Sequence, residues 1–237
     1  MLPFLLFLLF IFAKKKDMKK ILLLALVSLC CMTNGASAKD AEGDLHAIVM
    51  VEGGYSHHFG DLNSTWTQYF NSFQRQLRNG YSLQAAAMGC FSKNVCAGVV
   101  VWQKGFTAKD DDFIYNTTET MDMKYIGPVL GVQDYMGPGL LGIYASAGFT
   151  HFSDKYVSRT VRMGETVEDR FVTGAFGYLI DLKYMFCLGK FVMAGPSIGY
   201  YGFRVRTDNN GFWAEDWEKE YFRIDGFNVT ACLGLRF

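Results

Sequence analysis

The sequence predicts an all-β fold: an eight-stranded, antiparallel, up-and-down transmembrane β-barrel with four long external loops, one of them with a helical pattern. Three observations favour this fold class. Aromatic residues make up 16% of the chain and glycine occurs 25 times, yet no long apolar run follows residue 38. Stretches of period-2 alternation recur, as in strands with one lipid-facing side. The connections between them alternate in length, which is typical of outer-membrane barrels.

The last stretch of the chain shows the alternation most clearly. One of its faces is apolar throughout, and its members are Phe227, Val229, Ala231, Leu233, Leu235 and Phe237. The other face is small or polar, so the first suits lipid and the second suits a filled interior. The same rule predicts eight strands, near residues 44–56, 80–91, 95–107, 119–133, 139–152, 170–186, 191–206 and 221–237.

The connections between these strands fall into two classes. Short ones lie at residues 92–94, 134–138 and 188–190, and long ones at 57–79, 108–118, 153–169 and 207–220. Eight strands with both chain ends on the inner side give three short turns and four long outer loops, which is the pattern found here. A secreted β-sandwich is not expected to sort its connections in this way.

Two apolar stretches precede the first predicted strand. The second, at residues 21–32, follows Met18-Lys19-Lys20 and comes before Ala36-Ser37-Ala38, as in a secretory signal peptide. We expect a signal peptide over 1–38, with Met18 as the true start, residues 1–17 as an overrun upstream of it, and cleavage after Ala38. Residues 39–237 then form the barrel domain. They hold 18 basic and 22 acidic side chains, a balance that does not suggest nucleic-acid binding.

Several polar residues fall on inward positions of the predicted strands. An eight-stranded barrel is just wide enough inside for side chains to fill. Because an isolated charge there is costly, we expect a buried polar network that plugs the lumen. A narrow gated path for protons or small solutes is the alternative interpretation. The predicted network consists of Glu52, Gln84, Asp181, Lys183 and Arg236.

Four cysteines follow the predicted leader, and all lie at inward positions towards the periplasmic end: Cys90, Cys96, Cys187 and Cys232. A Cys90–Cys96 disulfide across the hairpin is feasible in an oxidising compartment, and small lumen-filling side chains are the other interpretation. The spacing resembles no zinc motif, and we expect neither a metal nor a cofactor.

Two of the predicted external loops are rich in aromatic residues. The first repeats large apolar residues at helical spacing: Trp66, Tyr69, Phe70, Phe73 and Leu77. This spacing predicts an amphipathic helix that covers the barrel mouth, lies at the lipid interface or binds a partner. The fourth loop carries Trp213 and Trp217 among acidic residues, which indicates either a ligand or carbohydrate contact or an aromatic girdle.

These features together resemble a known superfamily. The leader, the Gly-Pro-x-x-Gly segments at 127–131 and 195–199, and the terminal Leu235-Arg236-Phe237 look like small outer-membrane β-barrel proteins of the porin-like and OmpA-like superfamily, particularly those of Bacteroidetes. The resemblance covers the chain after the leader. It implies the bacterial outer membrane, contact with its lipid and lipopolysaccharide, and Phe237 as a signal to the barrel assembly machinery. We expect a barrel alone, without a periplasmic peptidoglycan-binding domain after Phe237, which departs from full-length OmpA-type proteins.

An enzymatic interpretation rests on His151-Phe152-Ser153 and Glu165. This set resembles that of outer-membrane lipid A deacylases, which implies Ser153 as nucleophile, His151 as its base and Glu165 as the orienting acid. That family carries its His-x-Ser step nearer the C-terminus, so we expect no enzyme.

The sequence therefore predicts a barrel with a filled lumen that contributes to envelope integrity or binds at the cell surface through its external loops. A small pore or transporter for small or hydrophobic solutes is the alternative function, and a lipid A-modifying hydrolase is a third. No residue pattern identifies the external ligand.

Overall fold

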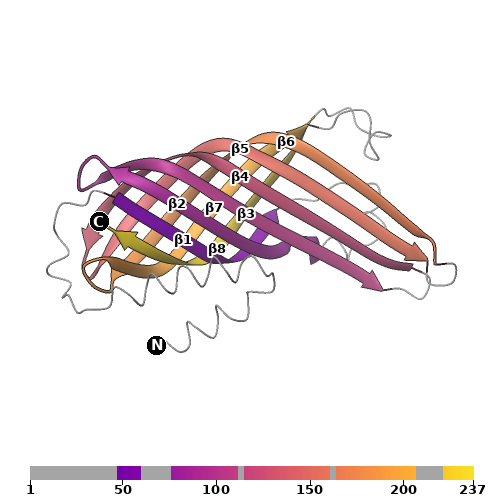
Figure 1. Ribbon diagram of the computed structural model, residues 1–237, viewed down its shortest axis with the longest axis horizontal. Helices are drawn as coiled ribbons and strands as arrows, with labels where there is room; N and C mark the ends of the chain where they lie inside the picture. Colours follow the sequence, from indigo (N-terminus) through magenta and orange to yellow (C-terminus); the bar gives the residue numbers. More distant parts are fainter. Residues whose placement is uncertain (1–46, 60–75, 112–114, 161–163, 207–220) are drawn as a thin grey trace. The chain divides into compact units, whose positions relative to one another are not determined.

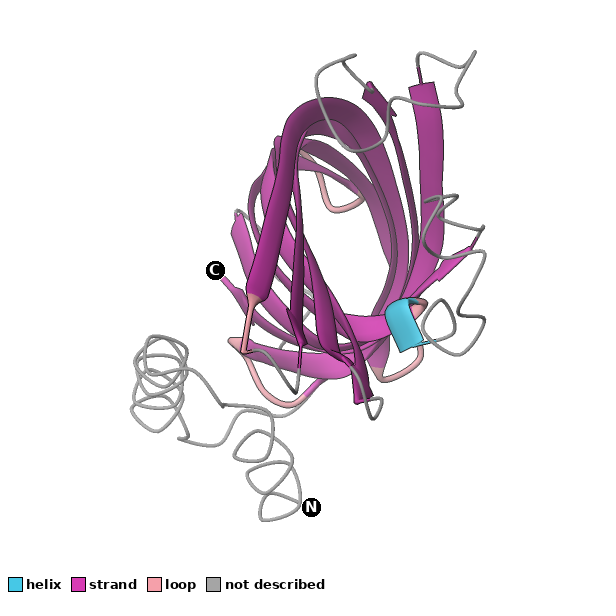
Figure 2. Ribbon diagram, turned by 90° about the vertical axis from the view of Figure 1, so that its right-hand side faces the viewer, coloured by secondary structure: helices cyan, strands magenta, loops and turns pink. Residues whose placement is uncertain are grey.

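The computed structural model describes residues 47–59, 76–111, 115–160, 164–206 and 221–237. Each strand is antiparallel to its sequence neighbours and β8 pairs with β1, so the sheet closes into a barrel (Figures 1 and 2). The predicted eight-stranded up-and-down barrel is thereby confirmed. The strands are β1 (Ala47–Phe59), β2 (Asn79–Cys90), β3 (Val95–Asp111), β4 (Tyr115–Met136), β5 (Gly139–Thr160), β6 (Thr166–Cys187), β7 (Val192–Arg206) and β8 (Tyr221–Arg236). No helix in the described part of the chain is long and apolar enough to cross a membrane.

The stagger between strands determines how far they tilt. Stepping from Ile48 through successive cross-strand partners returns the path to β1 at His58, ten residues farther along. The path runs through Met88, Gly98, Val129, Ser146, Leu179, Tyr201 and Gly226. Such a stagger goes with a strand tilt of roughly 40° and an interior that side chains fill.

The two ends of the barrel differ. Short connections join β2 to β3, β4 to β5 and β6 to β7 at one end, which we call the turn end. Phe237 lies at this end too, because its backbone N–H donates at 2.9 Å to the carbonyl oxygen of Ala47, the first residue of β1. At the other end β3 to β6 run on past their neighbours (Figure 1), and we call it the extended end.

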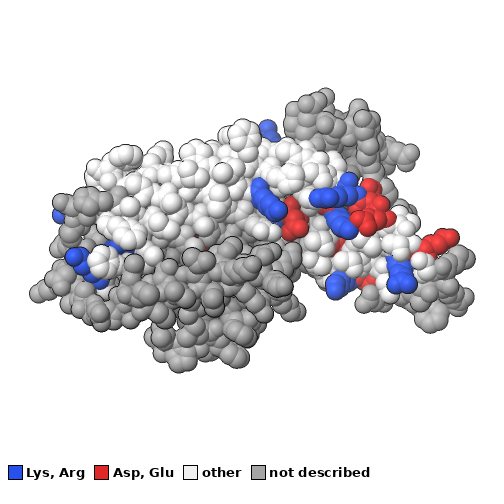
Figure 3. Space-filling model, in the orientation of Figure 1, with Lys and Arg blue, Asp and Glu red and all other residues white. Residues whose placement is uncertain are grey.

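The outward face divides into an apolar band and a polar zone. On β4 the outward residues from Ile126 to Val132 are apolar, and Lys124 begins a polar series on the same face. On β5 the change comes between Phe149 and His151. The apolar band is about nine residues per strand, or roughly 20–25 Å along the axis of a tilted barrel, which matches the hydrocarbon layer of an outer membrane. Figure 3 shows most of the visible charged side chains, and nearly all of the acidic ones, towards the extended end, beyond this band.

The predicted loops 108–118 and 153–169 are wrong for most of their length. β3 continues to Asp111 and β4 starts at Tyr115, while β5 continues to Thr160 and β6 starts at Thr166. Apolar–polar alternation marks a strand only where its two faces differ in polarity. The outward face becomes polar beyond the apolar band, and past Met121 and Phe152 the inward face becomes mostly polar as well. The backbone ladder continues there, so the sequence signal ends before the strands do.

The two Gly-Pro segments interrupt the sheet without shifting it. Pro128 and Pro196 both face outward, and each coincides with a gap in the pairing of its strand. The pairs on either side of each gap keep one register, so the prolines remove ladder hydrogen bonds and insert no bulge. The flanking pairs are Ile126↔Phe149 with Val129↔Ser146, and Lys183↔Ser197 with Phe186↔Ala194.

Cys90 and Cys96 face each other at the turn end of the β2–β3 hairpin and form a disulfide, with Cα atoms 4.0 Å apart. The disulfide interpretation is thereby confirmed over free thiols for this pair. Cys187 and Cys232 are free, and Cys232 is buried in the lumen.

We expect alkylation of the denatured, unreduced protein to modify only Cys187 and Cys232 among the cysteines after residue 38. Reduction beforehand should add two alkyl groups, which mass spectrometry would count. Replacing both Cys90 and Cys96 with serine should lower the free energy of unfolding by about 2 kcal/mol, because the bond closes a short loop. Four modified cysteines without reductant would contradict the pairing.

Candidate functional site

Four side chains meet across the middle of the lumen, and we call them the lumen charge cluster. Asp181 and Lys183 lie two residues apart on β6, so both point inward, and Glu52 on β1 and Gln84 on β2 face them from the other side. Lys183 Nζ donates to Glu52 Oε1 and lies 3.0 Å from Asp181 Oδ2. Gln84 Nε2 donates to Asp181 Oδ2 at 2.6 Å and to Glu52 Oε1 at 3.2 Å. These four members of the predicted network therefore come together as a single hydrogen-bonded unit.

The cluster is cut off from solvent and extended by its neighbours, while Gln84 Oε1 and Asp181 Oδ1 have no hydrogen-bond partner among the described residues. Lys183 and Asp181 are 1% exposed and Glu52 is 5% exposed. Thr230 Oγ1 donates to Glu52 Oε2 at 3.0 Å, and Lys183 Nζ lies 5.5 Å from the centre of the Tyr144 ring. Buried charges are tolerated only when they are paired and hydrogen-bonded in this way, so each member depends on the others.

Lys104 is a second buried lysine, which the sequence analysis did not identify. Its Nζ donates to Asn228 Oδ1 at 2.9 Å and to Ser82 Oγ at 3.2 Å, and it lies 4.0 Å from the centre of the Tyr201 ring. With Lys183 it balances the two lumen carboxylates, so the centre of the lumen is neutral when all four are ionised. Trp102 and Lys104 are successive inward residues of β3. The period-2 pattern of this strand could therefore have identified Lys104 as an inward residue.

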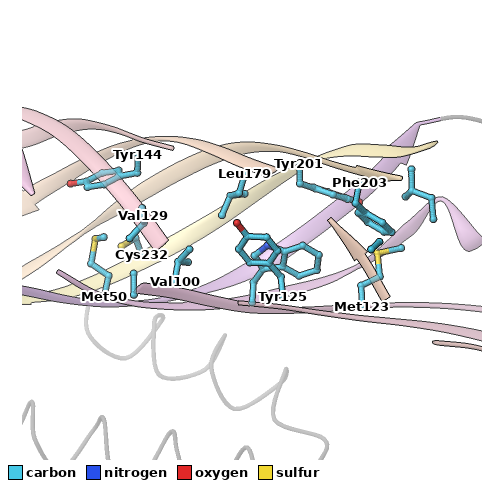
Figure 4. Close-up of a cluster of buried hydrophobic side chains, with 14 of the residues drawn as sticks. Met50, Val100, Met123, Tyr125, Val129, Tyr144, Leu179, Tyr201, Phe203 and Cys232 are labelled. Atoms are coloured by element: carbon cyan, nitrogen blue, oxygen red, sulfur yellow. The ribbon is translucent and has the colours of Figure 1, made fainter. Parts of the chain in front are cut away.

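Apolar layers close the lumen on both sides of these polar groups. The layer at the turn end consists of Ile48, Met50, Met88, Leu140, Met185 and Met193, each at most 3% exposed. The layer at the extended end consists of Phe106, Met121, Met123, Phe152, Phe203 and Ile224, each at most 2% exposed. Figure 4 shows this order along the barrel, from Met50 past Tyr125 and Tyr201 to Phe203 and Met123. A hydrated ion would have to cross both layers.

Inward glycines make room for the large rings in the lumen. A Cβ on Gly131 would lie 2.5 Å from Tyr144 Cδ1, and one on Gly142 would lie 2.6 Å from Tyr144 Oη. Tyr144 therefore lies across β4, where its hydroxyl donates to Gln133 Oε1 at 2.9 Å. The inward glycines leave room for aromatic rings, and these rings fill the lumen in place of water.

The prediction that Arg236 belongs to the same network is wrong. Arg236 is inward and buried, but it lies at the turn end, opposite Ile48 rather than Glu52. Its guanidinium donates to Gly189 O and Lys190 O, both at 2.8 Å, and so holds the β6–β7 turn. Four residues along a strand separate the levels of Arg236 and Glu52, roughly 13 Å, so they share a face but not a cluster.

The residues of the enzymatic interpretation do not come together. His151 and Ser153 are both on the outward face of β5, whereas Glu165 follows the far end of that strand. The cross-strand partner of Ser153 is Val172, seven residues along β6 from Glu165, which is roughly 23 Å. Glu165 therefore cannot orient His151 as the acid of a triad must.

Other predicted site residues have less structural detail. The loop residues Trp66, Phe70, Phe73, Trp213 and Trp217 lie outside the described residues, as does the predicted leader. Leu77, the last residue of the predicted helix, is described and buried. Phe237 is exposed at the end of the chain, and its role in assembly stays a prediction.

Beyond the apolar band, the inner face carries a pair of buried carboxyl groups that the sequence analysis also missed. Glu119 on β4 and Asp154 on β5 are 5% and 6% exposed, and they interact through their side chains. Burial, together with the charge of Asp154, raises the pKa of Glu119 to about 8. Burial is also the main reason that the pKa of Asp154 rises to about 7, and Asp169 on β6 adds to it. The pair therefore retains at least one proton near neutral pH.

No family model matches the sequence, and no curated protein matches it either. Three solved structures illustrate what the fold is similar to. Neisserial surface protein A aligns with 83% of this chain and 100% of its own, at 11% identity and a TM-score of 0.46. The attachment invasion locus protein Ail of Yersinia pestis aligns with 82% of this chain and 100% of its own, at 11% identity and a TM-score of 0.44. The outer membrane protein OprG of Pseudomonas aeruginosa aligns with 82% and 98%, at 9% identity and a TM-score of 0.40.

At these values the likeness transfers no activity or ligand to this chain. The fold rests instead on the closed register of its own eight strands. The barrel fold that the resemblance implies is confirmed by this register. The Bacteroidetes affinity stays a prediction.

Proposed function

We propose that the protein is a closed, non-conducting β-barrel of the bacterial outer membrane, and that it acts on the outer side, as a surface-binding or envelope-stabilising scaffold. The observation that carries this proposal is the lumen: the buried charge cluster, whose charge Lys104 balances, lies between two apolar layers. With the lumen occupied by side chains, the accessible working surface is the polar zone of the extended end. The long connections and the projecting strands β3 to β6 belong to that end.

The apolar band supports the location. Its height suits a hydrocarbon layer, and polar residues on β4 and β5 continue the same outward faces beyond it. With the short connections in the periplasm, the extended end points away from the cell. Neither surface binding nor envelope stabilisation requires a catalytic residue.

Gel migration of the chain from purified outer membranes tests the location and the folded barrel together. The protein should be recovered in the outer-membrane fraction. A closed barrel resists mild detergent, so unheated and boiled samples of that fraction should migrate differently on the gel. The matched control is a boiled and cooled sample without detergent-assisted refolding, which should keep the unfolded mobility. Recovery in the soluble periplasm with no heat shift would reject the proposal.

A further inference from the structure

Two arginines face each other on the outward surface just beyond the apolar band. Arg204 on β7 is the cross-strand partner of Arg223 on β8, and both side chains are exposed. The β6 neighbour of Arg204 is Phe176, which is 63% exposed. Like charges directly opposite on one face of a sheet destabilise it, so this pair requires an explanation.

The surroundings hold Arg223 in place. Arg223 Nε lies 2.5 Å from Asp225 Oδ2, and Arg223 Nη2 donates to Tyr178 Oη at 3.3 Å. Tyr178 reaches these groups from β6 by crossing Gly202 on β7, where an added Cβ would lie 2.6 Å from its hydroxyl oxygen. Three neighbouring strands thus cooperate to fix one guanidinium at the edge of the apolar band.

Arg204 has no such partner. Among the described residues it forms no ion pair, and Asp225 is already engaged by Arg223. Two guanidiniums and one carboxylate leave a net charge of +1 on this patch. An anion held between the arginines would offset their repulsion, and guanidinium forks match the oxygens of a phosphate group.

The position of the patch indicates where the anion comes from. On the same outward face of β7, Gly202 separates Arg204 from Tyr200 and Ile198, which belong to the apolar band. A lipid whose acyl chains cover Ile198 and Tyr200 brings its headgroup to the level of Arg204. We propose that Arg204 and Arg223 bind a phosphate group of an outer-leaflet lipid headgroup. This inference rests on the proposed membrane location.

The test measures how tightly the folded, full-length barrel binds lipid A that carries two phosphates, by native mass spectrometry from detergent micelles. Arg204→Gln should weaken binding at least tenfold, and Arg204→Lys should recover part of the loss, because lysine keeps the charge but not the fork. Lys109→Gln is the matched control. It makes the same charge change on an exposed outward residue of β3 farther from the apolar band, and it should leave binding within twofold.

Three outcomes would overturn the lipid-phosphate site: equal binding of dephosphorylated lipid A, an equal loss in Lys109→Gln, or displacement of the lipid by millimolar inorganic phosphate. The last would identify a soluble-anion site instead. The heat shift is recorded on the same samples. A retained shift without lipid binding rejects only this site, whereas loss of the shift in the unaltered protein rejects the barrel proposal itself.

Discussion

Replacing Lys183 with methionine should lower the free energy of unfolding by about 3–5 kcal/mol, because it leaves two buried carboxylates without their shared cation. Lys183 Nζ contacts both Glu52 and Asp181, and all three groups are almost fully buried. Urea unfolding of the barrel in lipid vesicles, followed by tryptophan fluorescence, measures the change. Methionine keeps most of the side-chain volume, so the loss reports on charge rather than on a cavity.

The chain offers a matched control in the polar zone. Lys155 and Glu168 form an ion pair of 2.6 Å, but their side chains are 46% and 55% exposed. Lys155→Met should therefore cost less than about 1 kcal/mol. Adding Glu52→Gln to Lys183→Met restores the charge balance with Lys104 and should recover more than about 1 kcal/mol. Equal effects of Lys183→Met and Lys155→Met would contradict a buried cluster.

The second large effect is a fall in stability with rising pH, caused by Glu119 and Asp154. Their folded-state pKa values, about 8 and about 7, lie above their usual values of 4.5 and 3.8. Between about pH 4 and pH 8 the folded state therefore binds more protons than the unfolded state. Stability is greatest below this range, decreases through it and levels off above it, and each unit of pKa shift contributes about 1.4 kcal/mol.

Glu119→Gln should remove the part of this slope that comes from Glu119, about half, and stabilise the barrel at pH 9, because glutamine is neutral at every pH. The measurement is urea unfolding in vesicles at pH 5, 7 and 9. Glu168→Gln provides the comparison, since Glu168 lies on the exposed face of the same projecting strands. A slope unchanged by Glu119→Gln, or removed equally by Glu168→Gln, would show that the buried pair is not its source.

The sequence could predict the strand number and the faces of the strands because the apolar outer face of the barrel gives the chain a period of two. That rule placed Glu52, Gln84, Asp181 and Lys183 on the inward face, and the structure joins all four. It also made the Cys90–Cys96 bond feasible, because hairpin register brings opposed residues together.

Alternation gives the face of a residue but not its level along the axis. Level depends on the stagger between strands, which only the register supplies, and this is why Arg236 was assigned to the wrong group. The projecting parts of β3 to β6 were missed for a related reason: their outward residues are polar, so no apolar face marks the alternation there. Asp154 lies in those parts and was missed with them, whereas Glu119 lies at the start of a predicted strand, where alternation gave its face but not its buried partner.

The closed lumen is the central claim, and planar bilayer recording tests it most directly. Purified, folded protein inserted into a bilayer should produce no sustained channels at neutral pH, in either the oxidised or the reduced state. The presence of the barrel in the bilayer must be verified independently, by recovery of the heat-shifting form from the membrane. Sustained, reproducible conductance steps from that form would mean that the apolar layers around Met50 and Phe203 do not close the lumen, and the scaffold proposal would give way to a pore.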